Sequence, residues 1–306
     1  MPIPEPILEG MRNAPHLYQM SIEQIRRVFT EQCAAAPKLP YAGTVEDRSI
    51  PTARRETPIR IYSMPCDPPA PVIMFFHGGG MVFGDLNILD AACRYLSEHT
   101  PCTVISVDYA LSPESKFPGP LEECHDAVMW AVENAESLGI DPARIAVAGD
   151  SAGGNLSAAM CMLARERKAF SIVHQVLLYP WLDLACDATE KVNEHNKIPL
   201  DGGDLNFCRD MYLTDVAAEG KLPLVSPVYA EDLTGLPPAT LVTEDLDPLQ
   251  KEGQLYAQRL TKAGVPVGSM NFPNMIHAFI QFTGFAEEAS VALDFVCGQL
   301  QKTFFA

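Results

Sequence analysis

One serine in this chain stands in a pattern that could make it a nucleophile. Ser151 lies between Gly149 and Gly153, directly after the apolar run 144–148 and before a helical pattern. A chain that reverses this sharply strains the serine backbone and leaves no room for side chains two residues before and after it. The pattern therefore predicts a nucleophile elbow, with the serine hydroxyl exposed at a strand end beside the free N–H groups of the next helix.

A second motif, His77-Gly78-Gly79-Gly80, follows the apolar run 72–76. Attack on a carbonyl places negative charge on its oxygen, and each preorganised backbone N–H group stabilises that charge by about 2.7–4 kcal/mol. Glycines let the backbone approach the oxygen and turn its N–H groups inward. Upstream of a serine elbow, this motif predicts an oxyanion hole rather than a flexible surface turn. We expect His77 to anchor the loop and not to transfer protons.

A serine hydroxyl is a weak nucleophile unless a base accepts its proton. After an elbow of this type the chain order is serine, acid, histidine, which leaves His174, His195 and His277 as candidates. His174 starts a predicted strand at the far end of the sheet, and His195 falls in a polar insertion. His277 is therefore the predicted base, because it lies in a predicted loop, 274–279, after the predicted strand 266–272.

The carboxylate that orients the histidine should lie after a strand, between the serine and the histidine in the sequence. Glu244, Asp245 and Asp247 all qualify, because they follow the predicted strand 239–243. Pro248 fixes a turn before the next helix and favours Asp247, which could equally be the N-cap of that helix. Position alone leaves the choice open.

A sheet must position these residues, and β and α patterns alternate along most of the chain. The segments 47–52 and 58–62 predict an antiparallel edge. The pattern then predicts strands at 72–76, 103–108, 144–148, 175–179, 239–243 and 266–272, and helices from 121 to Gly139 and at 152–167, 249–263 and 287–303. This alternation predicts an α/β fold, with a mostly parallel eight-stranded sheet flanked by helices and active groups at the carboxyl ends of the strands.

Two segments break this rhythm. Residues 1–43 contain a capping-box pattern at Ser21 followed by apolar residues at helical spacing, which predicts an amphipathic helix. Residues 183–221 are polar and helical, and a long insertion in a compact fold is usually a lid or disordered. We expect the two segments to form a helical cap on a core made of residues 44–182 and 222–306.

Composition narrows the classes of partner and compartment. The 306 residues are 47% hydrophobic and carry 22 Lys and Arg against 39 Asp and Glu, a formal net charge of −17 that disfavours nucleic acid. Nine dispersed cysteines without metal-ligand spacing fit a reducing cytoplasm better than a disulfide framework. Residues 1–6 do not resemble a secretory signal, and no run approaches the roughly 18 apolar residues of a membrane span.

These motifs together resemble those of the hormone-sensitive-lipase family of α/β-hydrolases, which includes bacterial esterases (bacterial family IV) and related mammalian lipases. The resemblance extends over almost the whole chain. It is carried by His77-Gly78-Gly79-Gly80 with Gly84, the segment 108–118, the nucleophile block 141–156, and the acid block with Ser226-Pro227, Leu236-Pro237-Pro238 and Asp247-Pro248-Leu249.

The resemblance implies six site residues: the nucleophile Ser151, the acid Asp247, the base His277, and the oxyanion donors Gly79, Gly80 and Ala152. It implies an intracellular serine carboxylesterase, free of metal and other cofactors, that hydrolyses small-molecule esters of short- to medium-chain acids through an acyl-enzyme. For the oligomeric state, the hypothesis is a homodimer. The alternatives are a non-catalytic small-molecule binding protein on the same fold, or a lipase, amidase or lactonase that uses the same triad.

Four positions depart from the family pattern. Ala110 stands where arginine is usual, Ser112 where alanine is usual, Lys251 where a second acid often follows, and Ala278 where glycine follows the histidine. None of them removes a catalytic group. Ala278 adds a methyl group beside the base, so the chemistry is better predicted than the substrate preference.

Overall fold

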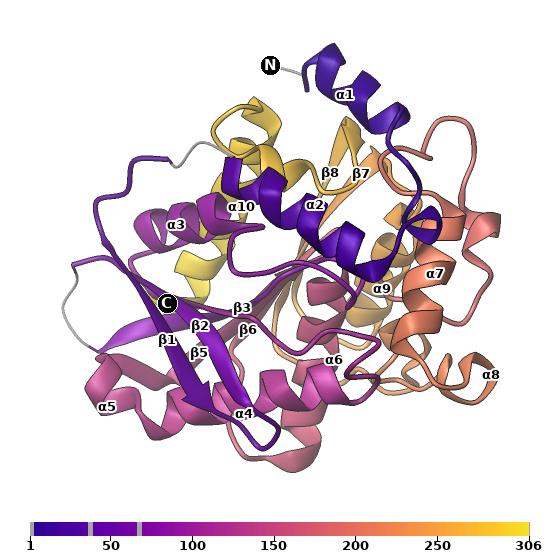
Figure 1. Cartoon of the computed structure of the whole chain (residues 1–306). Coiled ribbons are helices and arrows are strands. Elements are labelled where there is room, and N and C mark those ends of the chain that lie inside the picture. The colour runs from indigo at the N-terminus through magenta and orange to yellow at the C-terminus, as the bar shows by residue number, and fades with distance from the viewer. Residues whose placement is uncertain (1–2, 36–38, 66–68, 306) are drawn as a thin grey trace.

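Eight strands form one sheet in the part of the chain that the computed structural model describes, residues 3–35, 39–65 and 69–305 (Figure 1). Their order across the sheet is β1-β2-β4-β3-β5-β6-β7-β8. The strands are β1 (Thr44–Pro51), β2 (Glu56–Ser63), β3 (Ala70–Phe76), β4 (Thr103–Val107), β5 (Ile140–Asp150), β6 (His174–Leu178), β7 (Ala239–Leu246) and β8 (Val267–Ile276). β1 and β2 form the predicted antiparallel edge, β2 is antiparallel to β4, and all later neighbours pair in parallel.

Helices cover both faces of this sheet. They are α1 (Glu5–Arg12), α2 (Ile22–Ala35), α3 (Asp90–His99), α4 (Gly119–Glu133), α5 (Ala135–Leu138), α6 (Ala152–Arg167), α7 (Gly202–Tyr212), α8 (Val216–Glu219), α9 (Gln250–Lys262) and α10 (Glu287–Phe304), with the 3₁₀ turns η1 (Leu17–Gln19), η2 (Ala188–Lys191), η3 (Pro227–Tyr229) and η4 (Phe279–Phe282). Residues of α4, α6 and α9 belong to one apolar cluster, and residues of α3 and α10 belong to another.

The central strand β3 shows why the sheet is apolar on both sides. Val72, Met74 and Phe76 join the first cluster, whereas Ile73 and Phe75 join the second, and all five are fully buried. Successive side chains of a strand point to opposite faces, so a strand covered on both sides reads as a continuous apolar run. The α/β-hydrolase architecture predicted from the sequence is confirmed.

Several predicted boundaries are wrong. The helix predicted to run to Gly139 is two helices, because α4 ends at Glu133 and α5 covers the last turn. The predicted loop 274–279 begins later, because β8 continues to Ile276, which pairs with Leu246 of β7. The sequence patterns also miss α1 and α3, and the insertion 183–221 is helical only in η2, α7 and α8.

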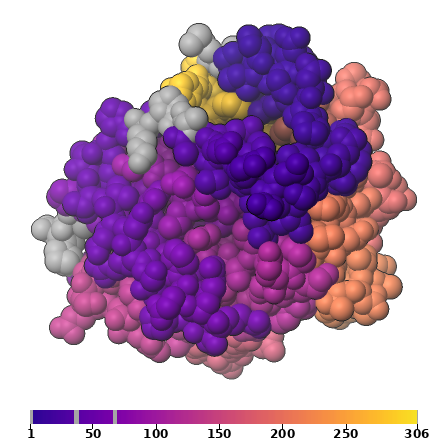
Figure 2. Space-filling view, viewed as in Figure 1, coloured from indigo at the N-terminus to yellow at the C-terminus, as the bar shows by residue number. Residues whose placement is uncertain are grey.

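The two segments predicted as a cap lie side by side. In Figure 1, α2 crosses above the strands and η1 reaches α7, and Figure 2 shows the indigo N-terminal segment on the surface beside the orange α7 region. His16 Nδ1 lies 3.1 Å from Asp201 Oδ2, and the Leu17 N–H donates to Asp204 Oδ1 at 2.6 Å. The division into cap and core domains stays a prediction.

Two further observations concern the helices and the cysteines, on which the sequence-based prediction of the protein's compartment rests. Within the described ranges, no helix combines the length and the apolar character that crossing a membrane requires. Eight cysteines lie in these ranges and no disulfide joins any two of them, while Cys66 lies outside the described residues.

Candidate active site

Ser151 stands alone between β5 and α6, in a strained backbone conformation with φ 52° and ψ −116°. Its N–H donates to the Leu178 carbonyl at 2.8 Å, which fixes the turn against β6. The flanking glycines are required by close approach. A Cβ on Gly149 would lie 2.3 Å from the Gly153 carbonyl carbon, and a Cβ on Gly153 would lie 1.8 Å from the Phe76 oxygen. The turn therefore has the steric requirements of a nucleophile elbow.

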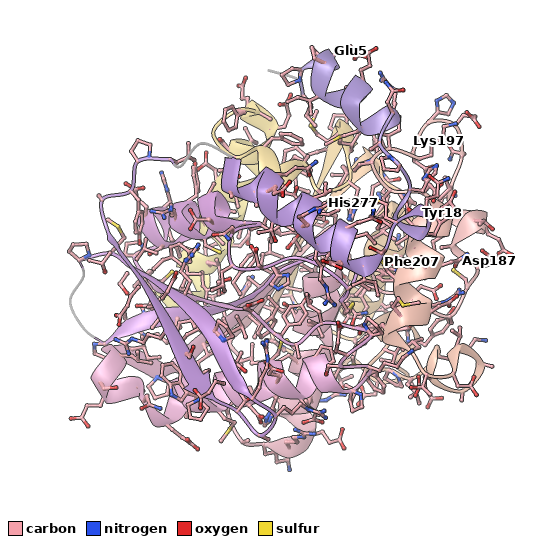
Figure 3. The ribbon with its side chains drawn as sticks, viewed as in Figure 1. Glu5, Tyr18, Asp187, Lys197, Phe207 and His277 are labelled. Atoms are coloured by element: carbon pink, nitrogen blue, oxygen red, sulfur yellow. The ribbon has the colours of Figure 1, made fainter. Side chains whose placement is uncertain are left out.

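The predicted triad residues meet at one edge of the sheet. Ser151, Asp247 and His277 are each the first residue after a strand, β5, β7 and β8 respectively. His277 Nε2 lies 2.9 Å from Ser151 Oγ, and His277 Nδ1 lies 3.0 Å from Asp247 Oδ2. All three are buried, with Ser151 8% and His277 6% exposed. Figure 3 labels His277 together with Tyr18 of η1 and Phe207 of α7.

Asp247 is held by the turn that precedes α9. Its second oxygen, Oδ1, accepts the Leu249 N–H at 2.9 Å, and the alternative that Asp247 is the N-cap of this helix is wrong, because the N-cap of α9 is Leu249. With the imidazole proton on Nδ1 facing Asp247, Nε2 is free to accept the hydroxyl proton of Ser151. This arrangement can transfer a proton from the serine to the histidine while the carboxylate stabilises the resulting charge.

The loop after β3 can bind an oxyanion. Gly79 and Gly80 have φ values of 110° and 61°, in the left-handed region that favours glycine. Among the described residues, no protein acceptor takes the N–H of either glycine. Ala152 is the first residue of α6, where N–H groups have no partner within the helix. Ala152 adjoins Ser151 in the chain, and the assignment of Gly79, Gly80 and Ala152 as oxyanion donors stays a prediction.

Three residues make contacts that hold the loop after β3 in place. The sequence predicted an anchoring role for one of them, His77, but not the contacts themselves. Asp150 Oδ1 accepts the Gly78 N–H at 2.6 Å, and burial raises the pKa of Asp150 to about 6. The Tyr109 hydroxyl donates to the His77 carbonyl at 2.6 Å, and its ring stacks on the His77 ring. Burial lowers the pKa of His77, which keeps it neutral. These contacts agree with an anchoring role for His77; the pairing of Asp150 with Gly78 has no signal in the sequence.

The other sequence candidates lie elsewhere or play other parts. His174 begins β6 and bonds to Thr240 and Thr303, at the end of the sheet away from Ser151, and His195 is exposed in the insertion. Asp245 is exposed and its Oδ1 accepts from Asn271 and Gln250. Glu244, by contrast, is fully buried, with Oε1 4.0 Å from His277 Nδ1.

Residues of α2 and α7 contact the loop from outside. Arg26 of α2 donates to the Val82 carbonyl at 2.9 Å and to the Ser112 carbonyl at 2.8 Å. Phe29, one turn later, stacks on Phe83 with ring centroids 4.1 Å apart. From the other side, Cys208 of α7 lies so close that a Cβ on Gly80 would be 2.6 Å from its sulfur. The segments outside the sheet thus constrain the loop that could hold the oxyanion.

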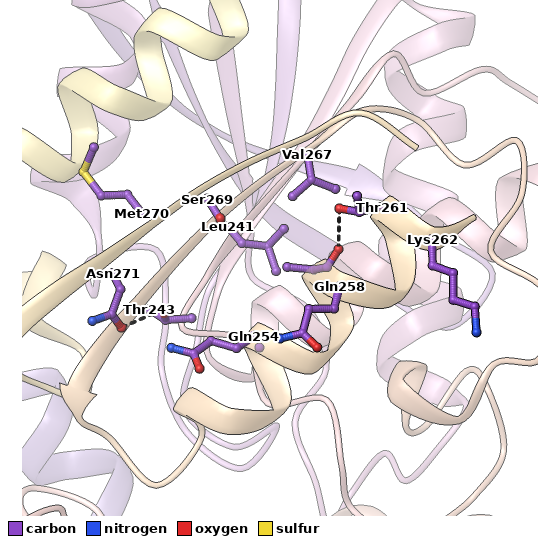
Figure 4. A pocket seen from close by; sticks show the side chains of 12 residues that line it. Leu241, Thr243, Gln254, Gln258, Thr261, Lys262, Val267, Ser269, Met270 and Asn271 are labelled. Atoms are coloured by element: carbon purple, nitrogen blue, oxygen red, sulfur yellow. Dashed lines mark hydrogen bonds between the residues drawn. The ribbon is translucent and has the colours of Figure 1, made fainter. Parts of the chain in front are cut away.

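One groove of the molecule lies away from the triad, and its lining contains none of the triad residues. A groove of about 590 Å³ lies between α9 and the β7–β8 edge, lined by amide side chains such as Gln254, Gln258 and Asn271 (Figure 4). Asn271 bonds to Thr243 across the two strands at 2.9 Å. The described residues that line this groove include no buried charged group, so its chemistry differs from that of the triad.

Comparisons with known proteins agree with this geometry. Residues 73–281 match the sequence profile of a family described as having the alpha/beta hydrolase fold. The chain is 40% identical to an arylesterase of Saccharolobus solfataricus over 92% of this chain and 91% of that protein, and 33% identical to an ethyl acetate hydrolase of Pseudomonas putida over 94% and 92%. It is similar in structure to a hyperthermophilic esterase of the archaeon Pyrobaculum calidifontis, with a TM-score of 0.88, 32% identity and full coverage of both chains.

Proposed function

This chain belongs to the hormone-sensitive-lipase-like (bacterial family IV) esterases of the α/β-hydrolase superfamily, and on that premise we propose how it works. It is a carboxylic ester hydrolase, as its curated relatives are. We propose that it is a serine esterase acting on short- to medium-chain acyl esters. The observation that carries the proposal is the unbroken chain of contacts from Ser151 Oγ through His277 to Asp247, at 2.9 and 3.0 Å.

The first half of the reaction transfers the acyl group to the enzyme. Ser151 Oγ attacks the ester carbonyl carbon while His277 Nε2 takes the hydroxyl proton. The carbonyl oxygen becomes negatively charged in the tetrahedral intermediate and receives hydrogen bonds from the N–H groups of Gly79, Gly80 and Ala152. His277 then gives its proton to the leaving alkoxide, so the alcohol departs and a Ser151 acyl ester remains.

The second half repeats these steps with water. His277 Nε2 takes a proton from water, the hydroxide attacks the acyl carbon, and the same N–H groups hold the oxyanion. The proton returns to Ser151 Oγ as the carbon–oxygen bond breaks, which releases the carboxylic acid. Asp247 stays ionised throughout and stabilises the imidazolium. Activity therefore falls at acidic pH, because a protonated imidazole cannot accept a proton.

The preference for short acyl groups is supported by how little space the covering segments leave. Ser151 is 8% exposed, and Cys208 of α7 lies directly against Gly80. A long acyl chain needs an apolar channel, and α7 comes within van der Waals reach of the loop that would hold the carbonyl. On this basis we also propose that 1–43 and 183–221 form a cap that sets acyl-chain selectivity.

The proposal is tested with 4-nitrophenyl acetate and butyrate as substrates. The wild-type chain should turn over both, and esters of increasing acyl length should be hydrolysed progressively more slowly. Ser151→Ala should lose turnover while keeping its circular dichroism spectrum, whereas the exposed Ser137→Ala should behave as wild type. No turnover by wild type, or full turnover by Ser151→Ala, contradicts the proposal, and stoichiometric ester binding without hydrolysis favours the binding-protein alternative.

Two predictions from the sequence stay predictions. They are a cytoplasmic location, which rests on the dispersed cysteines, and a homodimer, which light scattering on the purified chain would test. The small-molecule ester is the partner that the relatives' activities support.

A further inference from the structure

A second carboxyl group lies beside the triad and has no role in the mechanism above. Glu244 is on β7, three residues before Asp247, and its side chain is fully buried. Its Oε1 lies 4.0 Å from His277 Nδ1. One oxygen of Glu244, one oxygen of Asp247 and a ring nitrogen of His277 all lie within 4.8 Å of one another. Two carboxyl groups therefore face the same side of one imidazole.

The surroundings of Glu244 offer no compensation for a negative charge. In the described ranges, neither of its oxygens has a hydrogen-bond donor, and no Lys or Arg forms an ion pair with it. Because side chains alternate along a strand, Glu244 lies on the same face of the sheet as Val242. Val242 belongs to the apolar cluster that also contains Tyr179 and Phe279. A buried carboxylate with no cation is costly, and a second one beside Asp247 adds repulsion between like charges.

We propose that Glu244 is a positioning residue of the triad, carrying a proton at working pH and donating it in a hydrogen bond to the Asp247 carboxylate. This inference rests on the proposed catalytic role of Asp247. A proton held between two carboxyl groups removes the repulsion between their charges, and the His277 Nδ1–H already contacts Asp247 Oδ2. The proton stays on Glu244 during turnover, and the proton that moves is the one exchanged between Ser151 and His277.

The titratable groups that face Glu244 support this assignment. Burial raises the pKa of Glu244 well above its ordinary value, and the charge of Asp247 raises it further. Tyr179, whose ring lies 5.1 Å from the His277 ring, is neutral because burial raises its pKa. Burial raises the pKa of Asp150, a further acid near the site, and the charge of His277 opposes that rise. None of these groups supplies a positive charge that would ionise Glu244.

The hydrogen bond has two consequences for catalysis. It fixes the Asp247 carboxylate from a third direction, in addition to the Leu249 N–H and His277. It also draws negative charge away from the oxygen that faces the imidazole, so Asp247 stabilises the imidazolium less than an unshared carboxylate would. An ionised Glu244 would do the reverse, because its charge 4.0 Å from Nδ1 would stabilise the imidazolium. The pH profile of the enzyme therefore distinguishes the two states.

The experiment compares Glu244→Gln, Glu244→Leu and the control Asp245→Asn in the full chain. Gln keeps a donor toward Asp247 but cannot ionise, and Leu removes the donor at similar volume. Asp245 is the neighbouring carboxyl group of the same strand, but it is exposed. kcat and KM for 4-nitrophenyl butyrate are measured from about pH 5 to about pH 9, across the range in which a histidine titrates. Titration with a serine-reactive organophosphate counts the intact sites.

For Glu244→Gln we expect the midpoint of the acidic limb to move by less than about 0.3 pH unit, since neither form carries a charge. For Glu244→Leu we expect kcat to fall about 10- to 100-fold with KM nearly unchanged, and the acidic limb to move upward. Asp245→Asn should match wild type. A downward shift of about one pH unit or more in Glu244→Gln would show an ionised Glu244 and overturn the proposal, as would wild-type kcat in Glu244→Leu.

Infrared spectroscopy provides a readout that needs no turnover. At about pH 8, where ordinary carboxyl groups are ionised, wild type and Ser151→Ala should show the carbonyl stretch of a protonated carboxylic acid, and Glu244→Gln should lack it. Absence of that band from wild type overturns the proposal even if Glu244→Leu fails to fold. If Ser151→Ala keeps full turnover, the proposed mechanism fails separately, while the band still decides the protonation of Glu244.

Discussion

The triad and the segments that cover it are built in different ways. Ser151, Asp247 and His277 are the first residues after three strands of one sheet, so the backbone ladder sets their spacing. The N-terminal segment and the insertion 183–221 lie outside the sheet, and side-chain contacts such as Arg26 on the Val82 carbonyl and buried apolar residues such as Ile25 and Tyr212 hold them in place. The catalytic residues thus lie where the backbone is most constrained. Access to them depends on segments whose geometry is set by the contacts of individual side chains.

This contrast has a physical basis. A sheet with apolar clusters on both faces cannot shift one strand without breaking buried packing, because interiors are close-packed. Exposed ion pairs contribute little each, typically about 0–1 kcal/mol, so the charged contacts of the covering segments can change at low cost, whereas their buried residues such as Ile25 and Tyr212 cannot. Substitutions in the triad should therefore affect rate far more than substitutions in the cover.

The largest effect on kcat is expected for Asp247→Asn, compared with the same substitution at Asp245. An amide cannot hold the His277 tautomer or stabilise the imidazolium, and loss of such a carboxylate lowers kcat by about 10⁴-fold. Asp245→Asn, two residues earlier and exposed, should change kcat less than about two-fold. Steady-state kinetics on 4-nitrophenyl acetate measures both. Equal losses in the two variants would contradict the assignment of the acid.

His174, on strand β6, should make the free energy of unfolding depend on pH, separately from any effect on catalysis. Burial lowers the pKa of His174 to about 4, and both ring nitrogens bond to threonines. Because the folded pKa is below the unfolded value of about 6.5, neutral His174 stabilises the fold above that pH, and this contribution is lost as pH falls toward 4. The loss amounts to about 3 kcal/mol by about pH 4.

Urea unfolding of wild type and His174→Gln at about pH 7 and about pH 4 measures this term as a difference between the two proteins. Glutamine keeps hydrogen-bonding groups but does not titrate, so the variant should lose less stability on acidification. Its esterase activity at neutral pH should match wild type. Equal acid sensitivity of the two proteins would mean that His174 is not neutral in the folded state.

A smaller effect is expected where the cover holds the oxyanion loop. Arg26→Ala removes the hydrogen bonds from α2 to the Val82 and Ser112 carbonyls, and a small displacement of the loop lowers kcat by about ten-fold. Arg26 also forms an ion pair with Glu114 at 2.7 Å. The Glu114 side chain is mostly exposed, so Glu114→Gln should lower kcat by less than about two-fold. Arg27→Ala, an exposed neighbour on the same helix, is the matched control. If Arg27→Ala and Arg26→Ala are equally impaired, the loop contacts do not position the donors.

The smallest effect is expected for Ala278→Gly. Ala278 follows the base with φ 66°, where an alanine is strained and a glycine is not. Removing the methyl group relieves this strain but increases the entropy of the unfolded chain, so unfolding free energy should change by less than about 1 kcal/mol. Turnover should change less than about two-fold. A larger change in acyl-length preference would make this position part of the acyl pocket.

The sequence predicted the parts of the fold and site that depend on local patterning. The bounds of α6 coincide with the prediction 152–167, because Ser151 ends the strand and the helical pattern starts at once. α3 was missed because its buried residues, Ala92, Cys93, Leu96 and Ser97, are small or mixed and produce a weak pattern. The φ of Ala278 explains why glycine is usual after this histidine.

Contacts that join distant residues could not be predicted in this way. Asp150 meets Gly78 across 72 positions, and Arg26 reaches Ser112 across 86. Glu244 entered the sequence argument only as a rival to Asp247, since nothing local distinguishes a buried carboxyl group from an exposed one on the same strand. Its neighbours are set by the pairing of β7 with β8 and by the ring of Tyr179.

Covalent trapping of the nucleophile tests the mechanism most directly. The wild-type chain is incubated with a serine-reactive organophosphate, digested, and mapped by mass spectrometry. One adduct per chain on the peptide that contains Ser151, formed much faster than in His277→Ala and blocked by a slowly hydrolysed ester, is the expected result. An adduct on another residue, or loss of activity without modification of Ser151, would contradict its role as the nucleophile.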